Sequence, residues 1–298
     1  MPIFCANYAG DPHCGTFPQN NIAMKVSLAI ATIGRIKELN RLLDSLRRQT
    51  HTDFEVLIAD QNPLGFLDDI LNTFACDLHI QRVCIEPQGV SNARNALFKL
   101  LAGDLVAFPD DDCWYAPDTL ETVAKFFQQH ESAQSAVGIW LHDESALPNP
   151  DIYNFSTHVV NYRELFRRGE TYVQFFRKGA VKAIGMFDPI LGPGTGLPYG
   201  CGEDTDYLLR ATKVGQVWRV PTIRVFHPLP NTQNPNQAHK WRAYGRGRMY
   251  LLKKHKLPLW FKIGNVAYPL WRALIEGRGN WRYRWEMFRG RLTELMNR

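Results

Sequence analysis

Apolar runs alternate with amphipathic stretches along most of the chain from Met24 onward. Val26–Thr32 and Phe54–Asp60 are nearly continuous hydrophobic runs that end in polar residues, as expected of buried parallel strands. Between them leucines recur at helical spacing on one face, at Leu39, Leu42, Leu43 and Leu46. This alternation predicts an α/β fold with a mostly parallel central sheet, sandwiched between helices in an αβα arrangement.

The same pattern continues beyond these first elements. Further strands are predicted at Leu78–Ile85, Leu105–Phe108, Ala136–Trp140, Tyr172–Phe176, Val217–Val220 and Ile223–Phe226. Helices are predicted over Ser91–Leu101 and Tyr207–Lys213. A glycine-rich stretch, residues 192–202, precedes the second helix and has the composition of a mobile flap.

Polar side chains gather where the predicted strands end. Thr32 and Asp60 close two strands, and Asp110, Asp111 and Asp112 follow a third. In open parallel sheets ligands bind at the carboxyl ends of the strands, so these side chains predict a site there. Clustered carboxylates are typical ligands of a hard divalent cation, which can hold a nucleotide diphosphate. The alternative is an acidic turn that caps a following helix near Asp118.

Composition changes the picture at the two ends of the 298-residue chain. Residues 1–23 are rich in Pro, Gly and Asn, show no signal-peptide pattern, and are predicted to be a disordered N-terminal extension. The six cysteines have no metal-type spacing and are interpreted as reduced thiols of a cytosolic protein.

The C-terminal segment, residues 236–298, is predicted to be a basic, aromatic helical appendage. Residues 240–298 contain 15 Lys or Arg and 3 Asp or Glu, a net charge of +12 against +6 for the whole chain. Its apolar stretch, Leu257–Ile275, is too interrupted by polar residues to span a bilayer but suits interfacial helices. A packing appendage with Trp residues in its core is the alternative. Single-stranded nucleic acid would also suit this composition, but no RNA-binding motif is present, so we expect no nucleic-acid partner.

Four separated blocks of the sequence together resemble the family 2 glycosyltransferases of GT-A fold. In chain order they are VSLAIATIGR, LRRQTHTDFEVLIADQN, GVSNARNALFKLLAGDLVAFPDDDCW and GEDTDYLLRATKVG. The resemblance implies a GT-A domain over residues 24–235, with a nucleotide-binding half at 24–115 and an acceptor half at 116–235. It also implies transfer of a sugar from a nucleotide-diphosphate donor, such as a UDP-sugar, with inversion of the anomeric centre.

The resemblance assigns roles residue by residue. Asp60 matches the aspartate that contacts the base, although Gln61-Asn62 depart from the usual pattern and leave the base open. Asp110 and Asp112 match the two ends of the DxD motif, near the ribose and on the cation, and Asp111 is expected to be solvated. Thr32 and Arg94 would complete the donor site. The alternative for Arg94 is a surface arginine that pairs with a nearby carboxylate.

Three further residues receive roles from the resemblance. Asp204 would be the catalytic base, and its alternative is a plain helix cap. Glu203 would bind acceptor hydroxyls, with Asp206 pairing with Arg210 four residues on. His227 would be a further metal ligand. The alternative is a structural role, which is more common for a single histidine.

The expected cofactor is Mn²⁺ or Mg²⁺, because carboxylate oxygens suit these ions. The expected partners are a nucleotide-diphosphate sugar and a glycan or lipid-linked acceptor of surface polysaccharide synthesis. The basic C-terminus adds a possible peripheral contact with anionic membrane, so the expected location is the cytoplasm, at the inner face of the cell membrane. Two other classes stay open: a sugar-nucleotide nucleotidyltransferase, and a catalytically silent nucleotide-sugar binding protein.

Overall fold

The computed structural model describes residues 3–8, 24–145, 156–162, 164–166, 169–229, 238–276 and 281–297. These residues form two compact units, each considered by itself. The first contains residues 1–87, 93–186 and 207–228, and the second contains residues 88–92, 187–206 and 229–298. The C-terminal helices thus share a unit with two internal segments, a grouping that the sequence pattern did not indicate. The predicted boundary at 235/236 lies outside the described residues.

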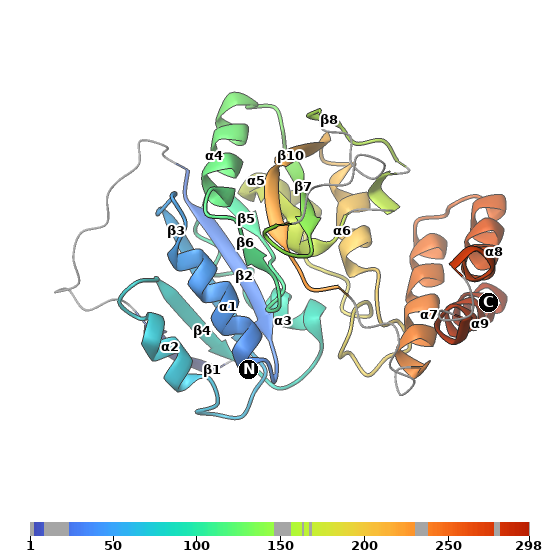
Figure 1. Ribbon diagram of the computed structural model, residues 1–298, viewed down its shortest axis with the longest axis horizontal. Coiled ribbons are helices and arrows are strands. Elements are labelled where there is room, and N and C mark those ends of the chain that lie inside the picture. Colours follow the sequence, from blue (N-terminus) through green and yellow to red (C-terminus); the bar gives the residue numbers. More distant parts are fainter. Residues whose placement is uncertain are drawn as a thin grey trace. The chain divides into compact units, whose positions relative to one another are not determined.

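A single mixed sheet forms the centre of the first unit (Figure 1). Its strands follow the order β1-β4-β3-β2-β5-β9-β7-β10-β6, and β8 pairs with β10. Their bounds are β1 Ile3–Tyr8, β2 Val26–Thr32, β3 Phe54–Asp60, β4 Ile80–Cys84, β5 Leu105–Ala107, β6 Trp114–Tyr115, β7 Ser135–Leu141, β8 His158–Val159, β9 Gln174–Arg177 and β10 Val217–Phe226. The block β4-β3-β2-β5 is parallel throughout, which confirms the predicted α/β class.

Helices of the first unit bury the faces that the leucine pattern predicted. In α1 (Ile36–Arg47) the four leucines at helical spacing are fully buried. The other helices that lie wholly in this unit are α2 (Asp68–Phe74), α4 (Thr119–Gln129) and α5 (Lys178–Ile184), with the short 3-10 turns η1 (Glu164–Phe166) and η2 (Thr171–Val173). The core beneath the carboxyl ends of the strands is aromatic: Phe108 packs against Phe176 and Tyr207. Its rigidity fixes the turn that follows β5.

The remaining two helices begin with residues of the second unit. They are α3 (Val90–Ala96) and α6 (Glu203–Ala211). Helix α6 begins four residues earlier than predicted. Because α6 starts at Glu203, Asp204 lies inside its first turn and does not occupy the cap position.

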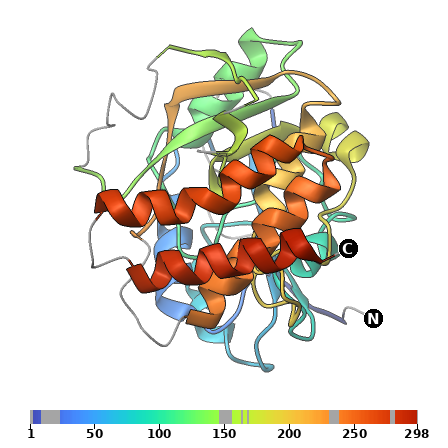
Figure 2. The ribbon, with the colours of Figure 1, turned by 90° about the vertical axis from the view of Figure 1, so that its right-hand side faces the viewer.

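The second unit is built around α7 (Ala238–Lys254), α8 (Leu259–Glu276) and α9 (Trp281–Met296), drawn in orange to red in Figure 2. Glycines allow the backbones of α7 and α9 to touch, because a Cβ at Gly245 or Gly290 would collide with backbone atoms of the facing helix. On α7, a Cβ at Gly247 would collide in the same way with the carbonyl oxygen of Cys201. The chain directly before Glu203 is therefore held against α7. None of the described helices is both long and apolar enough to cross a membrane.

Two predictions about the N-terminal half are wrong. Residues 3–8 were predicted to be disordered, yet they form β1, which pairs antiparallel with β4. The short run of apolar and aromatic residues suits an edge strand, and the Pro and Gly residues that follow it masked that signal. The cysteines are not all reduced, because Cys84 is disulfide-bonded. Residues 9–23 of the predicted extension lie outside the described part of the chain.

Candidate active site

The acidic turn after β5 lies at the carboxyl edge of the parallel strands. Asp110 forms an isolated bridge with Ala31 in β2, so it stands one strand away from Thr32, and Thr32 is in register with Asp60 of β3. The turn is tight, since the amide of Cys113 donates to the carbonyl oxygen of Asp110. The three predicted strand-end positions therefore meet at one edge of the sheet, as the strand order requires.

Asp110, Asp112 and His227 converge there from two strands. One ligand atom from each of these residues lies within 4.8 Å of the others. His227 follows β10, and its Nε2 lies 3.1 Å from Oδ1 of Asp112. Its Nδ1 lies 2.7 Å from the carbonyl oxygen of Pro228, which can only accept a hydrogen bond, so Nδ1 carries a proton. Nε2 is then the ring atom that is left to bind either a proton or a metal ion.

The donor set fits a hard or borderline divalent cation. Two carboxylates and an imidazole are ligands that Mn²⁺ accepts, and carboxylates also suit Mg²⁺. The ring of Tyr172 stacks on the imidazole, with centroids 4.5 Å apart and an interplanar angle of 10°. This packing fixes the orientation that a ligating histidine needs.

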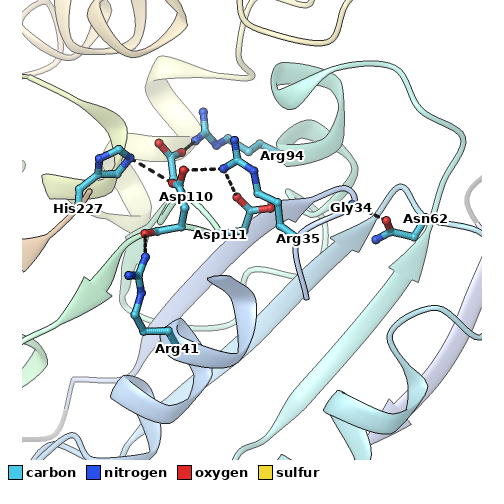
Figure 3. Close-up of polar contacts among 9 residues, drawn as sticks. Gly34, Arg35, Arg41, Asn62, Arg94, Asp110, Asp111 and His227 are labelled. Atoms are coloured by element: carbon cyan, nitrogen blue, oxygen red, sulfur yellow. Dashed lines mark hydrogen bonds and ion pairs between the residues drawn. The ribbon is translucent and has the colours of Figure 1, made fainter. Parts of the chain in front are cut away.

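Arginines neutralise the acidic turn in the structure (Figure 3). Nη1 of Arg35 lies 2.8 Å from Asp111 and 2.6 Å from Asp112. Arg94, on α3, pairs with Asp110 and is itself almost completely buried, so the alternative of an exposed surface arginine is wrong. Arg41, on α1, donates from Nη2 to the carbonyl oxygen of Asp112 at 2.7 Å. Sequence reasoning missed Arg35 and Arg41 as site residues, although Arg35 directly follows the turn after β2.

Burial and charge set different pKa values for the three neighbouring carboxylates. Burial raises the pKa of Asp110 despite the attraction of Arg94. Burial also raises the pKa of Asp111 to about 6, although Arg35 opposes it. For Asp112 the effect of burial is outweighed by the hydrogen bond and charge of His227 and by Arg35, so its pKa is lowered. Correspondingly, Asp112 raises the pKa of His227 against the effect of burial.

The expectation for Asp111 is wrong. It was predicted to be the solvated middle of the motif, but its side chain is only 8% exposed. The sequence could not show this, because the covering group, Arg35, comes from a turn far away in the chain. Asp112 is the more accessible of the two, at 18%.

Asp60 lies at the predicted edge but has partners within the protein. Its Oδ2 accepts from Nε of Arg82 at 2.8 Å, and its Oδ1 accepts from the backbone and side-chain nitrogens of Asn62. Asn62 in turn accepts from the amide of Gly34. Asp60 therefore orders the two turns that follow β2 and β3, and its contact with a nucleotide base stays a prediction. Thr32 is buried at the end of β2.

Glu203 and Asp204 belong to the second unit, at the first turn of α6. Oδ1 of Asp204 accepts from the amide of Thr205 at 2.5 Å. A carboxylate in the first turn is favoured in its ionised form by the helix dipole. Beside Glu203, a Cβ at Gly192 would come within 3.3 Å of its Oε2, so only glycine leaves full room for this carboxylate.

The glycine-rich stretch is anchored at several points within the second unit. The amide of Val90 donates to the carbonyl of Pro193 at 3.1 Å, and the hydroxyl of Ser91 donates to Leu191 at 2.7 Å. The amide of Gly200 donates to Ala243 of α7. The stretch is thus a hydrogen-bonded loop in the structure, and its mobility stays a prediction.

Asp206 has partners that the sequence did not predict. It is fully buried and lies 2.8 Å from both Nζ of Lys254 and Nε2 of His255, at the C-terminal end of α7. Arg210 donates to the carbonyl oxygen of Ile184. The i+4 pair of Asp206 with Arg210 that helical spacing suggested stays a prediction.

Comparison with known proteins shows the family of the chain. The family model for glycosyl transferase family 2 matches residues 27–186. An uncharacterized glycosyltransferase of Bacillus subtilis, YwdF, is 29% identical over 220 residues, which are 72% of this chain and 78% of that protein. A PGL/p-HBAD biosynthesis glycosyltransferase of Mycobacterium bovis is 36% identical over 167 residues, which are 54% of this chain and 62% of that protein.

Solved structures share the fold at low sequence identity. S. aureus TarS 1-349 in complex with UDP-GlcNAc has a TM-score of 0.60 at 14% identity, over 91% of this chain and 92% of that one. The mannosyltransferase PcManGT from Pyrobaculum calidifontis, in complex with GDP-Man and Mn²⁺, has a TM-score of 0.64 at 13% identity, over 94% and 89%. These structures are GT-A glycosyltransferases, which confirms the predicted fold.

Proposed function

The chain belongs to glycosyl transferase family 2, and from this premise we propose that it is a metal-dependent, inverting enzyme that uses a nucleotide-diphosphate sugar. The observation that carries the proposal is the convergence of Asp110, Asp112 and His227 at the carboxyl edge of the sheet. A UDP-sugar is the proposed donor, in line with the UDP-GlcNAc bound to TarS, and PcManGT was solved with Mn²⁺. Mn²⁺ or Mg²⁺ is the proposed cofactor.

The roles of the chain's own residues follow from their chemistry. Asp110, Asp112 and His227 would hold the cation, which would supply Lewis acidity for the departing diphosphate. Arg94 and Arg35 bring positive charge to the same edge, where the donor's phosphates bring negative charge. Asp60 and Thr32 line the donor side of this edge. Asp204 accepts the proton of the attacking acceptor hydroxyl, and Glu203 binds acceptor hydroxyls.

A titration with and without metal tests the donor site. Mn²⁺ should strengthen the binding of UDP to the parent protein, measured by calorimetry, and Asp112→Asn should remove that gain. Asp111→Asn removes the same charge from the adjacent position, which is outside the group Asp110, Asp112 and His227. This variant should keep most of the gain in UDP binding that Mn²⁺ provides. Equal behaviour of the two variants would show that the ligand assignment is wrong.

The donor itself can be identified by thermal shift in the presence of Mn²⁺. A ligand at 100 times its Kd stabilises the folded state by about 2.7 kcal/mol, which is readily detected. A panel of UDP- and GDP-sugars should give a clear shift with one donor, and that donor should be slowly hydrolysed. If none of them binds and none is turned over, the chain does not act on these nucleotide sugars.

We also propose that the acceptor is a glycan or a lipid-linked glycan of surface polysaccharide synthesis, reached at the cytoplasmic face of the membrane. Along α8, large apolar side chains form an exposed stripe at helical spacing: Trp260, Ile263, Trp271, Leu274 and Ile275. Trp281 and Trp285 of α9 are exposed as well. Such a stripe beside many Lys and Arg residues is typical of an interfacial helix on anionic lipid.

Vesicle sedimentation tests this contact. The full chain should bind vesicles that contain phosphatidylglycerol, and rising salt should weaken the binding because anionic lipid contributes about 1 kcal/mol per nearby basic residue. The double variant Trp260→Ser/Trp271→Ser should no longer sediment with the vesicles. Trp241 is buried, so it offers no contact to the lipid. Unchanged binding of the double variant would contradict the membrane role of α8.

A further inference from the structure

One buried arginine of the second unit has no counter-charge among the described residues. Arg291, on α9, is 7% exposed, and its Nε is buried without a hydrogen-bond partner. Its Nη1 donates to the carbonyl oxygen of Asn265 at 2.5 Å. A buried cation is costly unless an anion compensates it, so this position calls for an explanation.

Neighbouring arginines of the same helices do have carboxylate partners. Arg242 pairs with Glu286 at 2.8 Å, and Arg246 pairs with Glu294 at 3.1 Å. At these two positions the bundle therefore supplies an acidic partner for the arginine. The absence of an ion pair at Arg291, within the part of the chain that the structure describes, sets this residue apart.

A second arginine converges on the same residue of α8. Nε of Arg248, on α7, donates to Oδ1 of Asn265 at 3.2 Å. The two guanidinium groups thus approach one asparagine from two helices, one at its side chain and one at its backbone. Burial lowers the pKa of Arg291 to about 9, with a further contribution from the charge of Arg248. Two such neighbouring cations attract an anion between them, and Arg248 is half-buried, so a ligand can approach at its side.

The pair lies close to the start of α6 within the second unit. Gly247, next to Arg248, is in backbone contact with Cys201, and the thiol of Cys201 donates to the carbonyl of Tyr244 at 3.1 Å. The thiol also responds to charges on both sides. The pKa of Cys201 is raised to about 12, chiefly by burial and also by the charges of Glu203 and Asp204, while the charges of Arg248 and Arg291 act in the opposite direction. The arginines and the proposed base are therefore within electrostatic reach of one atom.

We infer that Arg248 and Arg291, held by Asn265, form a subsite for the phosphate group of a lipid headgroup on the acceptor. Guanidinium forks match phosphate oxygens in geometry and charge. The lipid source is favoured because Asn265 belongs to α8, whose exposed stripe is apolar. The inference deepens the proposed function and rests on it: a phosphate held here would present its attached glycan near Glu203 and Asp204.

Short-chain lipids test the subsite on the full chain without vesicles. The probes are monomeric dihexanoyl phosphatidic acid, dihexanoyl glycerol as the same lipid without phosphate, and inorganic phosphate. We expect phosphatidic acid to bind and Arg248→Gln to weaken it about tenfold to a hundredfold, the loss typical of hydrogen bonds to a charged group. Arg282→Gln removes the same charge from an exposed position of α9 and should change the affinity less than about twofold. Arg291→Lys keeps the buried charge but loses the fork, and should also weaken binding.

Each outcome decides the proposal. Equal effects of Arg248→Gln and Arg282→Gln, or no binding of phosphatidic acid to the parent chain, would overturn the subsite. Binding of inorganic phosphate as tight as that of phosphatidic acid would overturn the lipid source and assign the pair to the free anion. UDP with Mn²⁺ is titrated in parallel: loss of UDP binding in Arg248→Gln would assign the pair to the donor. Failure of the parent chain to bind any nucleotide would refute the proposed function and leave the phosphate result standing.

Discussion

Replacing Asp111 by asparagine should make the stability of the protein less sensitive to pH. Its side chain is 8% exposed, and burial raises its pKa from 3.8 to about 6. Because the folded protein holds this proton more tightly than the unfolded chain does, stability falls as the pH rises from about 4 to 6. Two pKa units correspond to about 3 kcal/mol over the full range, since one unit is 1.36 kcal/mol. Between pH 4.5 and 7.5 the same shift gives about 2 kcal/mol.

Urea denaturation in EDTA at these two pH values measures the effect. The free energy of unfolding of Asp111→Asn, relative to the parent, should rise by about 2 kcal/mol from pH 4.5 to 7.5. Glu121→Gln is the matched control, because a hydrogen bond from Lys125 lowers the pKa of Glu121. Its relative stability should fall as pH rises, by less than about 1 kcal/mol for so exposed a pair. The reasoning from burial would be refuted if the difference in free energy of unfolding between Asp111→Asn and the parent stayed constant within about 0.5 kcal/mol from pH 4.5 to 7.5, or if it fell.

Three further predictions concern the proposed chemistry. Asp112 raises the pKa of His227, and a bound metal must displace the proton on Nε2 of this ring, so Mn²⁺ affinity should rise about tenfold per pH unit below this pKa and then level off. In a fluorescence titration, His227→Gln should remove this dependence of Mn²⁺ affinity on pH. Asp204→Asn should lower kcat by about 10²–10⁴ while the Kd for UDP is retained, and near-parent turnover would instead favour a structural role at the helix start. Gly247→Ala forces a Cβ against the backbone of Cys201, so it should lower the free energy of unfolding by about 1–3 kcal/mol. Gly179→Ala, which has open space around its Cβ, should not lower it, and equal melting curves of the two variants would contradict the close contact at Gly247.

The local pattern was sufficient to predict the parallel half of the sheet. The bounds of β2 and β3 agree with the prediction residue for residue, because strands buried on both faces appear as unbroken hydrophobic runs between clear breakers. The convergence of Asp110 on the ends of these strands also followed, since parallel neighbours end at the same edge. The start of α6 was predicted four residues late, because Glu203 and Asp204 have no apolar periodicity of their own.

Tertiary partners could not be predicted in this way. The burial of Asp111 depends on Arg35, and the partners of Asp206 come from the end of α7, 49 residues away for His255. In both cases the partners come from distant elements of the chain, for which sequence spacing carries no signal. The edge strand β1 was hidden for a different reason, because a strand of six residues followed by a Pro- and Gly-rich stretch has too little periodicity to stand out.

Arg35 has a consequence for which ions can occupy the acidic turn. Its guanidinium is tethered within 2.8 Å of both Asp111 and Asp112, so it acts as an internal counter-ion at a local concentration that dissolved salt cannot match. A monovalent ion such as K⁺ gains no more charge compensation than Arg35 already provides, and it must first displace the tethered group. A divalent ion would bring twice the charge, and its proposed ligands include His227 as well. We therefore expect the turn to discriminate between ions of different valence before any nucleotide arrives, so that the potassium of the cell would be a weak competitor there.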